Sequence, residues 1–325
     1  MTAKQRSTKG TFVISIDVEM AWGTFDVGGL KKHKRDFEKV REVITRLLEV
    51  FQHYQTPVTW AIVGHLFLDS CRPENGIAHS DMPRPNYPWF PYDWYSLDPC
   101  TNYKKDPIWY GKDIVELIRS NNVNHEIACH SFSHVDFGHK GCSEEIARKE
   151  MQKCVQLADN IGLQMKSFVF PKNKTGHLDI LKENGFNVYR GKDKWWSDRF
   201  KRPLLNNIAQ FAEEFFCLPP RCHLPAEVLP GLWELPGSML FRSLNGPMAL
   251  IPLSWRPRRA LMGLHRAVAK REVFQLWFHP WHIANGLDKL INSLSIILKE
   301  ASRLRELGML EVVTLSEMPE LYGNK

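Results

Sequence analysis

Two histidines with three residues between them, and two acids far upstream, have the residue types and spacing that a catalytic metal needs. His130 and His134 follow an apolar run that starts at His125, whereas Asp17 and Glu19 lie near the N-terminus. Two imidazoles and one carboxylate can supply the three protein ligands of an open zinc-type site, whose fourth position is left for water. The second carboxylate could then act as the proton-transfer group.

The elements that must position these residues are strands that alternate with helices. Apolar and β-branched runs predict strands at 11–17, 57–63, 125–130, 168–170, 186–189, 273–278 and 310–315. Helical spacing and end signals predict helices at 40–51, 111–121, 143–161, 177–184 and 287–307. The alternation indicates βαβ units and a mostly parallel sheet. Strand ends, where barrels carry their active sites, hold four candidates for chemistry: Asp17, His130, Pro171 and His279.

The length and the rhythm of these elements predict one large domain. Strand–helix barrels reach about 250 residues or more when they carry insertions. We predict a single domain at 11–320, with insertions at about 71–110 and 191–272 and a flexible N-terminus at 1–10. The first insertion is rich in proline and aromatic residues, which is typical of a binding loop or a lid. Its aromatic side chains could stack on sugars or form a cluster that anchors the loop.

The composition indicates a globular protein with an anionic partner. The chain has a net charge of +7, and no motif that reads nucleic acid accompanies this charge. We therefore expect a phosphate-bearing substrate or an anionic lipid, and no nucleic acid. The basic stretch 258–271 could lie on an anionic membrane surface, or could be a solvated basic helix.

The cysteines and the N-terminus predict a cytoplasmic protein. The seven cysteines form no C-x-x-C pair, which argues for a reducing compartment. The first ten residues are basic and polar, and no stretch of eighteen apolar residues exists to span a membrane. We expect the protein in the cytoplasm, with peripheral association at the inner face of the membrane as an option.

The order of these motifs resembles the polysaccharide deacetylases, which are metal-dependent carbohydrate amidases and esterases. The resemblance covers most of the chain from 11 to 315 and is poor in the two insertions. It implies an α/β fold, a distorted (β/α) barrel with two loop insertions. The motifs that carry it are Ser15-Ile-Asp17-Val-Glu19, His125-Glu-Ile-Ala-Cys-His130-Ser-Phe-Ser-His134, Phe168-Val-Phe-Pro171 and Leu276-Trp-Phe-His279.

The resemblance also implies a role for each matching residue. Asp17 corresponds to the general base and His279 to the general acid. Glu19, His130 and His134 correspond to the ligands of a divalent metal, for which zinc is our first choice. The metal would lower the pKa of water and polarise the carbonyl, while a base and an acid on its two sides complete the hydrolysis.

Three positions depart from the common pattern of the family. Val18 stands where most members have a second aspartate, and Glu19 replaces an aspartate, which would place the metal slightly farther from the strand. Val169 stands where an arginine usually orients the base. The candidates to replace that arginine are Lys172, Asn173 and Arg190. Residues 193–196 only loosely match the family's Asp/Trp motif.

Several further residues are candidates for substrate contact, or have a plainer role. The substrate candidates are Trp22, Pro171, Asn173, Arg190, Trp196 and Trp281. Core packing is the alternative for Trp22 and Trp281. We interpret Glu126 as a structural acid, Cys129 as buried apolar filler, and His282 as a loop histidine or a second contact near the site.

Together these observations predict a hydrolase that removes an N-acyl group, acetyl or formyl, from an amino sugar. Because of the basic surface, we expect a nucleotide- or lipid-linked intermediate of surface polysaccharide biosynthesis. Two alternatives stay open. One is an amidohydrolase that acts on a non-sugar amide or ureide. The other is a catalytically weak binding module in glycan assembly, which Val18 and Val169 favour and the intact acids and His279 disfavour.

Overall fold

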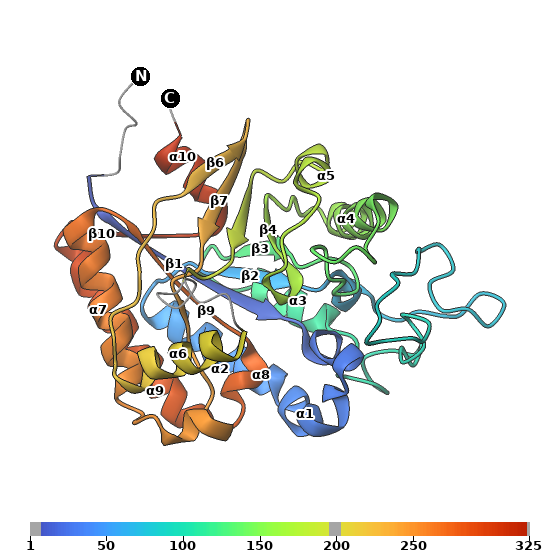
Figure 1. Ribbon diagram of the computed structural model, residues 1–325, viewed down its shortest axis with the longest axis horizontal. Coiled ribbons are helices and arrows are strands. Elements are labelled where there is room, and N and C mark those ends of the chain that lie inside the picture. Colours follow the sequence, from blue (N-terminus) through green and yellow to red (C-terminus); the bar gives the residue numbers. More distant parts are fainter. Residues whose placement is uncertain (1–7, 195–202, 324–325) are drawn as a thin grey trace.

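The computed structural model describes residues 8–194 and 203–323. In these ranges ten strands form one curled sheet of mostly parallel pairs, which closes part of a barrel (Figure 1). The strand order is β6-β7-β5-β4-β3-β2-β1-β9-β8, and β10 pairs with β1 outside this path. The predicted α/β fold, a distorted barrel, is confirmed. The predicted flexible segment 1–10 lies mostly outside the described residues, and Gly10 already belongs to β1.

The strands are short apart from the first. They are β1 (Gly10–Val18), β2 (Thr59–Ile62), β3 (Glu126–Cys129), β4 (Ser167–Val169), β5 (Val188–Gly191), β6 (Ala226–Leu229), β7 (Leu232–Pro236), β8 (Met239–Leu240), β9 (Val273–Phe278) and β10 (Leu310–Val313). The α-helices are α1 (Gly29–Glu38), α2 (Val40–His53), α3 (Lys112–Arg119), α4 (Glu144–Asp159), α5 (Leu178–Glu183), α6 (Pro203–Phe215), α7 (Trp255–Lys270), α8 (Pro280–Ile283), α9 (Leu287–Glu306) and α10 (Met318–Tyr322).

Strand β1 is the centre of the sheet. Its nine residues are all buried, because β9 pairs along one side and two strands share the other. On that other side β10 pairs with the first half of β1, and β2 pairs with Ser15–Val18. A strand enclosed in this way needs a continuous apolar run, which is the pattern of the sequence.

Helices cover the outside of the sheet, and their ends follow local sequence signals. Figure 1 shows α2, α7 and α9 on one side of β1 and β9, and α4 and α5 beyond β3 to β5. Helix α4 begins after Ser143, whose side chain accepts a hydrogen bond from the backbone N–H of Ile146, as the predicted N-cap requires. No described helix has both the length and the apolar character to cross a membrane.

The segment 191–272, which we predicted to be an insertion, contributes to the sheet. Strand β7 pairs with β5, and β8 pairs with β9. These strands have two to five residues, too few to give a clear alternating pattern in the sequence. The apolar side of α7 faces the core, where Leu264 is fully buried. Its Arg256 and Arg259 are also buried and donate to backbone carbonyls, so these two cations lie neither on a solvated face nor at a membrane.

The segment 71–110 is irregular and projects from one end of the barrel (Figure 1). Most of its aromatic side chains are buried in a common cluster, which fits the anchoring interpretation: Tyr87, Phe90, Trp94, Tyr95, Trp109 and Tyr110. Trp89 and Tyr92 are exposed and remain available to a ligand.

Candidate active site

Parallel strands deliver the predicted residues to one edge of the sheet. Asp17 pairs with Ala61 of β2, and Ile16 of β1 pairs with Phe278, the last residue of β9. His279, the residue after β9, therefore lies beside the acidic end of β1. His130 follows β3 and Arg190 lies in β5, so their side chains reach the same edge.

Three imidazoles converge on one carboxylate oxygen at this edge. The Nε2 atoms of His130 and His134 both lie 3.2 Å from Oε1 of Glu19, and Nε2 of His279 lies 3.1 Å from it. All four side chains come from different strand ends or the turn after β3. Those of Glu19, His130 and His134 are buried, and that of His279 is 14% exposed. Nε2 of His279 is also 3.8 Å from Oδ2 of Asp17.

These donors fit a divalent cation. The Nδ1 atom of His130 lies 2.7 Å from the carbonyl oxygen of Val169, which only accepts, so Nδ1 carries the proton. The Nε2 lone pair of His130 then faces an oxygen of Glu19, and two acceptors oppose each other. A cation between them removes this conflict. The hydrogen bond to Val169 orients His130 as a ligand of that cation. The sets Glu19–His130–His134 and Asp17–Glu19–His279 each keep their ligand atoms within 4.8 Å.

Arg190 forms a two-point pair with Asp17. Its Nη1 and Nη2 atoms donate to the two oxygens of Asp17 at 2.7 and 2.6 Å. Nη1 also donates to Ser15 Oγ at 2.9 Å, and Nη2 donates to Asn173 Oδ1 at 3.2 Å. Among the three sequence candidates to replace the missing arginine, Arg190 makes the direct pair and Asn173 supports it. The arginine has moved from the strand end of β4 to the neighbouring β5.

Burial and charge act in opposite directions on these acids. Burial raises the pKa of Asp17, but the Arg190 guanidinium more than offsets this, and the pKa is held below its ordinary value. Burial also raises the pKa of Glu19, and His279 and His134 together bring it well below its ordinary value. Both side chains are therefore carboxylates at neutral pH.

The imidazoles respond to the same charges. Burial lowers the pKa of His279, but Glu19 and then Asp17 raise it, and the pKa ends above its ordinary value. Burial lowers the pKa of His134, and Glu19 only partly offsets this. The edge thus holds a histidine suited to carry a proton beside one suited to offer a lone pair.

The turn that carries His134 has an unusual backbone. Ser131 and His134 have φ values of 57° and 62°, in the left-handed region that side chains rarely adopt. Ser133 between them is fixed by Glu150 of α4, which accepts from its backbone N–H at 2.8 Å and its hydroxyl at 2.6 Å. Trp94 of the segment 71–110 donates to the same hydroxyl at 2.9 Å. This network holds the strained turn in place.

Gly23 is a functional position that sequence reasoning missed. A Cβ atom at Gly23 would lie 1.9 Å from Oε2 of Glu19, so only glycine leaves room for this carboxylate. Gly23 is the last residue of the 3-10 turn Met20–Gly23, which follows Glu19, and its spacing from Glu19 was the only signal in the sequence.

The remaining substrate candidates differ in their location: one lies in the core, two lie beside site residues, and one is outside the described residues. Trp22 is fully buried against Trp109, so it belongs to the core and is no pocket wall. Trp281 packs against the ring of His279, and Pro171 is buried at the start of the turn that carries Asn173. Trp196 lies outside the described residues.

Three further predicted roles can be placed in the structure. Glu126 lies at the opposite end of β3 and accepts hydrogen bonds from Thr59 and Ser167, a structural arrangement. Cys129 is fully buried. His282 contacts the rings of His279 and Trp281 edge-on, and its Nδ1 atom is buried without a hydrogen-bond partner among the described residues.

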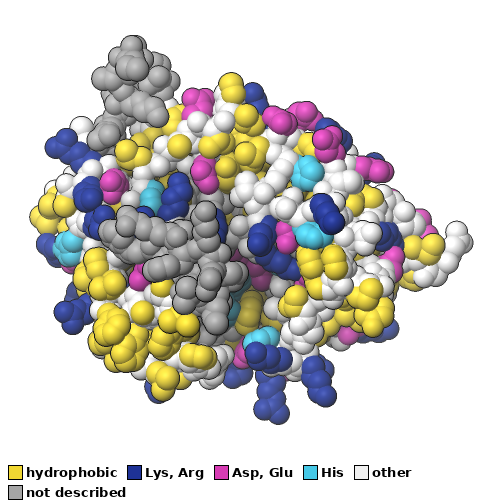
Figure 2. Space-filling model, in the orientation of Figure 1, with side chains coloured by type: hydrophobic (Ala, Val, Ile, Leu, Met, Phe, Trp, Pro, Cys, Tyr) yellow, Lys and Arg dark blue, Asp and Glu magenta, His cyan; other side chains and the backbone are white. Residues whose placement is uncertain are grey.

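Two hollows lie near this edge. One, of about 240 Å³, is bordered by Asn173, Asp193 and Trp277, and four cations line it: Lys172, Lys174, Lys192 and Arg242. The second is more apolar and measures about 670 Å³, with Trp89 and Tyr92 in its wall. Figure 2 shows basic side chains bordering the centre and the lower rim of this face, with acidic and histidine atoms between them.

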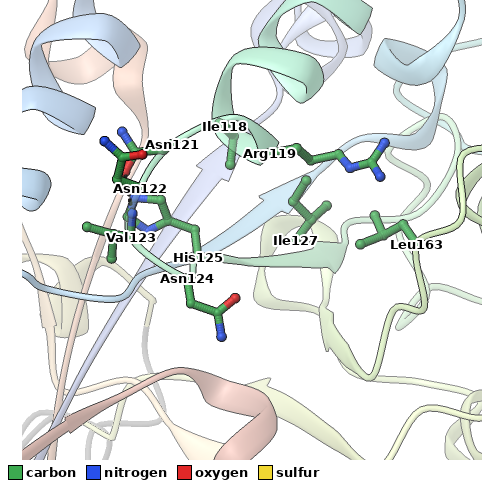
Figure 3. A pocket seen from close by; sticks show the side chains of 9 residues that line it. All are labelled: Ile118, Arg119, Asn121, Asn122, Val123, Asn124, His125, Ile127 and Leu163. Atoms are coloured by element: carbon green, nitrogen blue, oxygen red, sulfur yellow. Dashed lines mark hydrogen bonds between the residues drawn. The ribbon is translucent and has the colours of Figure 1, made fainter.

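A third hollow, of about 370 Å³, belongs to the other end of the sheet (Figure 3). It is lined by the C-terminal turn of α3, the loop 121–125 and the start of β3. His130 follows the far end of β3, so this hollow takes no part in the candidate site.

The comparisons with known proteins agree with the fold and show the family. A family model described as polysaccharide deacetylase matches residues 16–188, which hold Asp17, Glu19 and both histidines of the turn after β3. No curated protein matches the chain.

Solved structures share the fold at low sequence identity. A putative polysaccharide deacetylase from Mycobacterium smegmatis is 15% identical, with a TM-score of 0.63 over 98% of this chain and 92% of that one. The Puue allantoinase is 9% identical, with a TM-score of 0.61 over 99% and 94%. A probable polysaccharide deacetylase from Pseudomonas aeruginosa PAO1 is 9% identical, with a TM-score of 0.57 over 96% and 90%. The predicted barrel type is confirmed.

Proposed function

The chain belongs to the polysaccharide deacetylase family, and from that premise we propose that it is a metal-dependent hydrolase that removes an N-acyl group, acetyl or formyl, from a phosphate-bearing amino sugar. The observation that carries the hydrolase proposal is the convergence of three imidazole Nε2 atoms on Glu19 beside the Asp17–Arg190 pair. Glu19, His130 and His134 would hold the divalent cation, with zinc as our first choice. When bound, it would supply a Lewis acid for a carbonyl and lower the pKa of water.

Asp17 is suited to accept a proton during attack on the amide. Its charge is kept by Arg190, and the two-point pair fixes the direction of both carboxylate oxygens. A base held in this way is already oriented before the substrate arrives, which is the usual advantage of a positioned proton acceptor.

His279 is suited to donate a proton to the leaving amine. Its raised pKa favours the protonated ring at neutral pH, and its Nε2 atom lies 3.1 Å from Oε1 of Glu19. Trp281 and His282 pack on the ring and limit its rotation. A base from β1 and an acid from β9 can thus act on the same amide.

The phosphate requirement is supported by the smaller hollow. Four cations line it and Asp193 is the one acid among the lining residues. Lys172 pairs with Asp26 and Arg242 with Glu214, so Lys174 and Lys192 are the cations that we propose for the anion. The hollow shares Asn173 with the Arg190 network, so an anion there would lie next to the reacting group. A nucleotide- or lipid-linked amino sugar carries such an anion, and the apolar hollow beside Trp89 offers room for part of its carrier.

The test is acyl release by metal-loaded protein from matched substrates. The panel contains N-acetyl and N-formyl amino sugars with and without a nucleotide or polyprenyl phosphate, and a cyclic ureide. We expect acetate or formate from the phosphate-bearing sugars and a lower KM than for the neutral ones. The double variant Lys174→Gln/Lys192→Gln should remove that difference in KM while kcat stays unchanged.

Four outcomes would overturn parts of this proposal. No acyl release from any sugar would refute the hydrolase, and hydrolysis of the ureide alone would establish the non-sugar alternative. An equal KM for neutral and phosphate-bearing sugars would refute the anion site. A binding module would hold the sugars without releasing any acid.

A further inference from the structure

We propose that His65, Cys71, His79 and Asp98 bind a second divalent cation of the zinc type, which fastens the irregular segment 71–110 to the barrel. The cluster lies apart from the candidate active site and is independent of the proposed function. His65 belongs to the 3-10 turn Gly64–Phe67 after β2, and the other three residues belong to the irregular segment. Their ligand atoms all lie within 4.8 Å of one another.

The distances between these atoms match the edges of one small coordination shell. Nε2 of His65 lies 3.1 Å from Nε2 of His79, and these two nitrogens lie 2.9 and 2.8 Å from Oδ2 of Asp98. Sγ of Cys71 lies 3.4 Å from the same oxygen. Bonds of about 2.0 to 2.3 Å from zinc to nitrogen, oxygen and sulfur give a tetrahedron with edges of roughly 3.3 to 3.6 Å. Outward shifts of a few tenths of an ångström would make the observed shell fit.

With Asp98 ionised, every arrangement of protons leaves a conflict in this cluster. Nδ1 of His65 lies 3.1 Å from the carbonyl oxygen of Trp109, so it must donate there. If Nε2 of His65 keeps its lone pair, that lone pair faces an oxygen of Asp98. If both Nε2 atoms are protonated, the two N–H groups face each other across 3.1 Å. A cation at the centre removes both conflicts at once.

The surroundings of the cluster resemble those of a built metal site. The side chains of His65 and Asp98 are fully buried, and that of His79 is 7% exposed. The second oxygen of Asp98 accepts from the Tyr110 hydroxyl at 3.1 Å and from the backbone N–H of Cys100 at 2.9 Å. Bonds of this kind orient the ligands from outside, as partners of metal ligands usually do.

The donor set indicates the class of ion. One thiolate, two imidazoles and one carboxylate suit zinc, and four protein ligands leave no position for water, which is typical of a structural site. The segment 71–110 has few backbone ladders of its own, so a metal tie at its base would replace the stabilisation that strands give elsewhere. Through Trp94, this segment also reaches the turn that carries His134.

The experiment empties the candidate active site first. In the double variant His130→Ala/His134→Ala, we expect one equivalent of zinc per chain by elemental analysis. Substitution with Co²⁺ should give a thiolate-to-cobalt charge-transfer band in the near ultraviolet, because Cys71 is a ligand. Adding Cys71→Ser to this double variant should abolish both the bound equivalent of zinc and the cobalt charge-transfer band. Cys100→Ser is the matched control, since its thiol contacts Cys71 without being a ligand, and it should leave both unchanged.

The proposal fails if the double variant binds no zinc, or if the cobalt band is absent. It also fails if Cys71 and Cys100 of the purified protein form a disulfide, which alkylation and mass measurement would detect. If the Cys71→Ser protein does not fold, the metal content and the cobalt band of the double variant decide the matter alone.

Discussion

The molecule holds two clusters of potential metal ligands that are built in different ways. At the strand ends, Glu19 meets three imidazoles and an arginine-paired aspartate, so the set is rich in groups that move protons. In the irregular segment, Cys71 and Asp98 meet two imidazoles, and all four donors point at one another. A cation held by Glu19, His130 and His134 would keep a coordination position for a substrate, whereas four ligands would close the shell of the second cluster. The difference teaches that a sheet can bring several groups suited to catalysis to one edge. An irregular segment can instead use its ligand atoms to stabilise its own conformation.

The largest effect should come from removing the metals in turn. Brief dialysis against a chelator should take the ion from the three-ligand site, and hydrolysis should fall to background while the Tm stays unchanged. Longer treatment should strip the four-ligand cluster and lower the Tm by about 5 °C or more, because the segment 71–110 loses its tie. Parallel measurement of activity, zinc content and Tm over time tests this order. If activity and Tm fell at the same stage of the treatment, the two clusters could not be told apart as a catalytic and a structural metal site.

Replacing the base should nearly abolish turnover without affecting the other cluster. Asp17→Asn keeps the shape of the side chain but removes the proton acceptor, so we expect kcat to fall by about 10³-fold. Glu126→Gln is the matched control, because this acid is partly buried and accepts hydrogen bonds at the opposite end of the sheet. That variant should lose stability and keep its kcat. An active Asp17→Asn protein would favour a role in binding alone.

The arginine that orients the base should matter less than the base. Arg190→Lys keeps the charge but loses the two-point pair with Asp17, so kcat should fall by about 10- to 100-fold. Arg256→Lys provides the comparison, because Arg256 is also buried but donates only to backbone carbonyls. Its effect should appear in the Tm and leave kcat unchanged. Equal effects on kcat would mean that Arg190 acts only through packing.

The sequence predicted the strand-end cluster well, because its residues are tied to regular elements. Asp17, His130 and His279 end or follow apolar runs that can be recognised as strands. The choice of Arg190 among three candidates needed the register between β4 and β5, which no single strand pattern contains.

The other cluster could not be predicted, for a physical reason. Cys71, His79 and Asp98 lie in a segment without periodicity, and their spacing matches no common ligand motif. Only the path of the irregular chain brings them to His65. Strands β7 and β8 were not predicted from the sequence for a related reason. Their pairing with β5 and β9, more than their own residues, makes them strands.

A further histidine sharpens the comparison, because both of its ring nitrogens are buried and burial alone shifts its pKa. His125 packs against Phe51 and Trp60, and both of its ring nitrogens lack a hydrogen-bond partner among the described residues. Burial lowers its pKa to about 4, whereas the acids beside His279 turn the same burial into a raised pKa. Between its unfolded value near 6.5 and the folded value near 4, the folded chain binds fewer protons than the unfolded chain.

The free energy of unfolding should therefore fall as the pH falls through this window, and His125 contributes to that fall. His125→Phe fills the same space without a titrating group, so the variant should gain about 1 kcal/mol over the wild type when the pH is lowered from about 7 to about 5. Denaturant unfolding at the two pH values measures this, with the exposed His53→Phe as the control that should show no such gain. The variant and the wild type could instead lose the same free energy of unfolding on acidification. That result would mean that water in the hollow of Figure 3 solvates the ring of His125. The neighbouring carboxylates would then not explain why the pKa of His125 differs from that of His279.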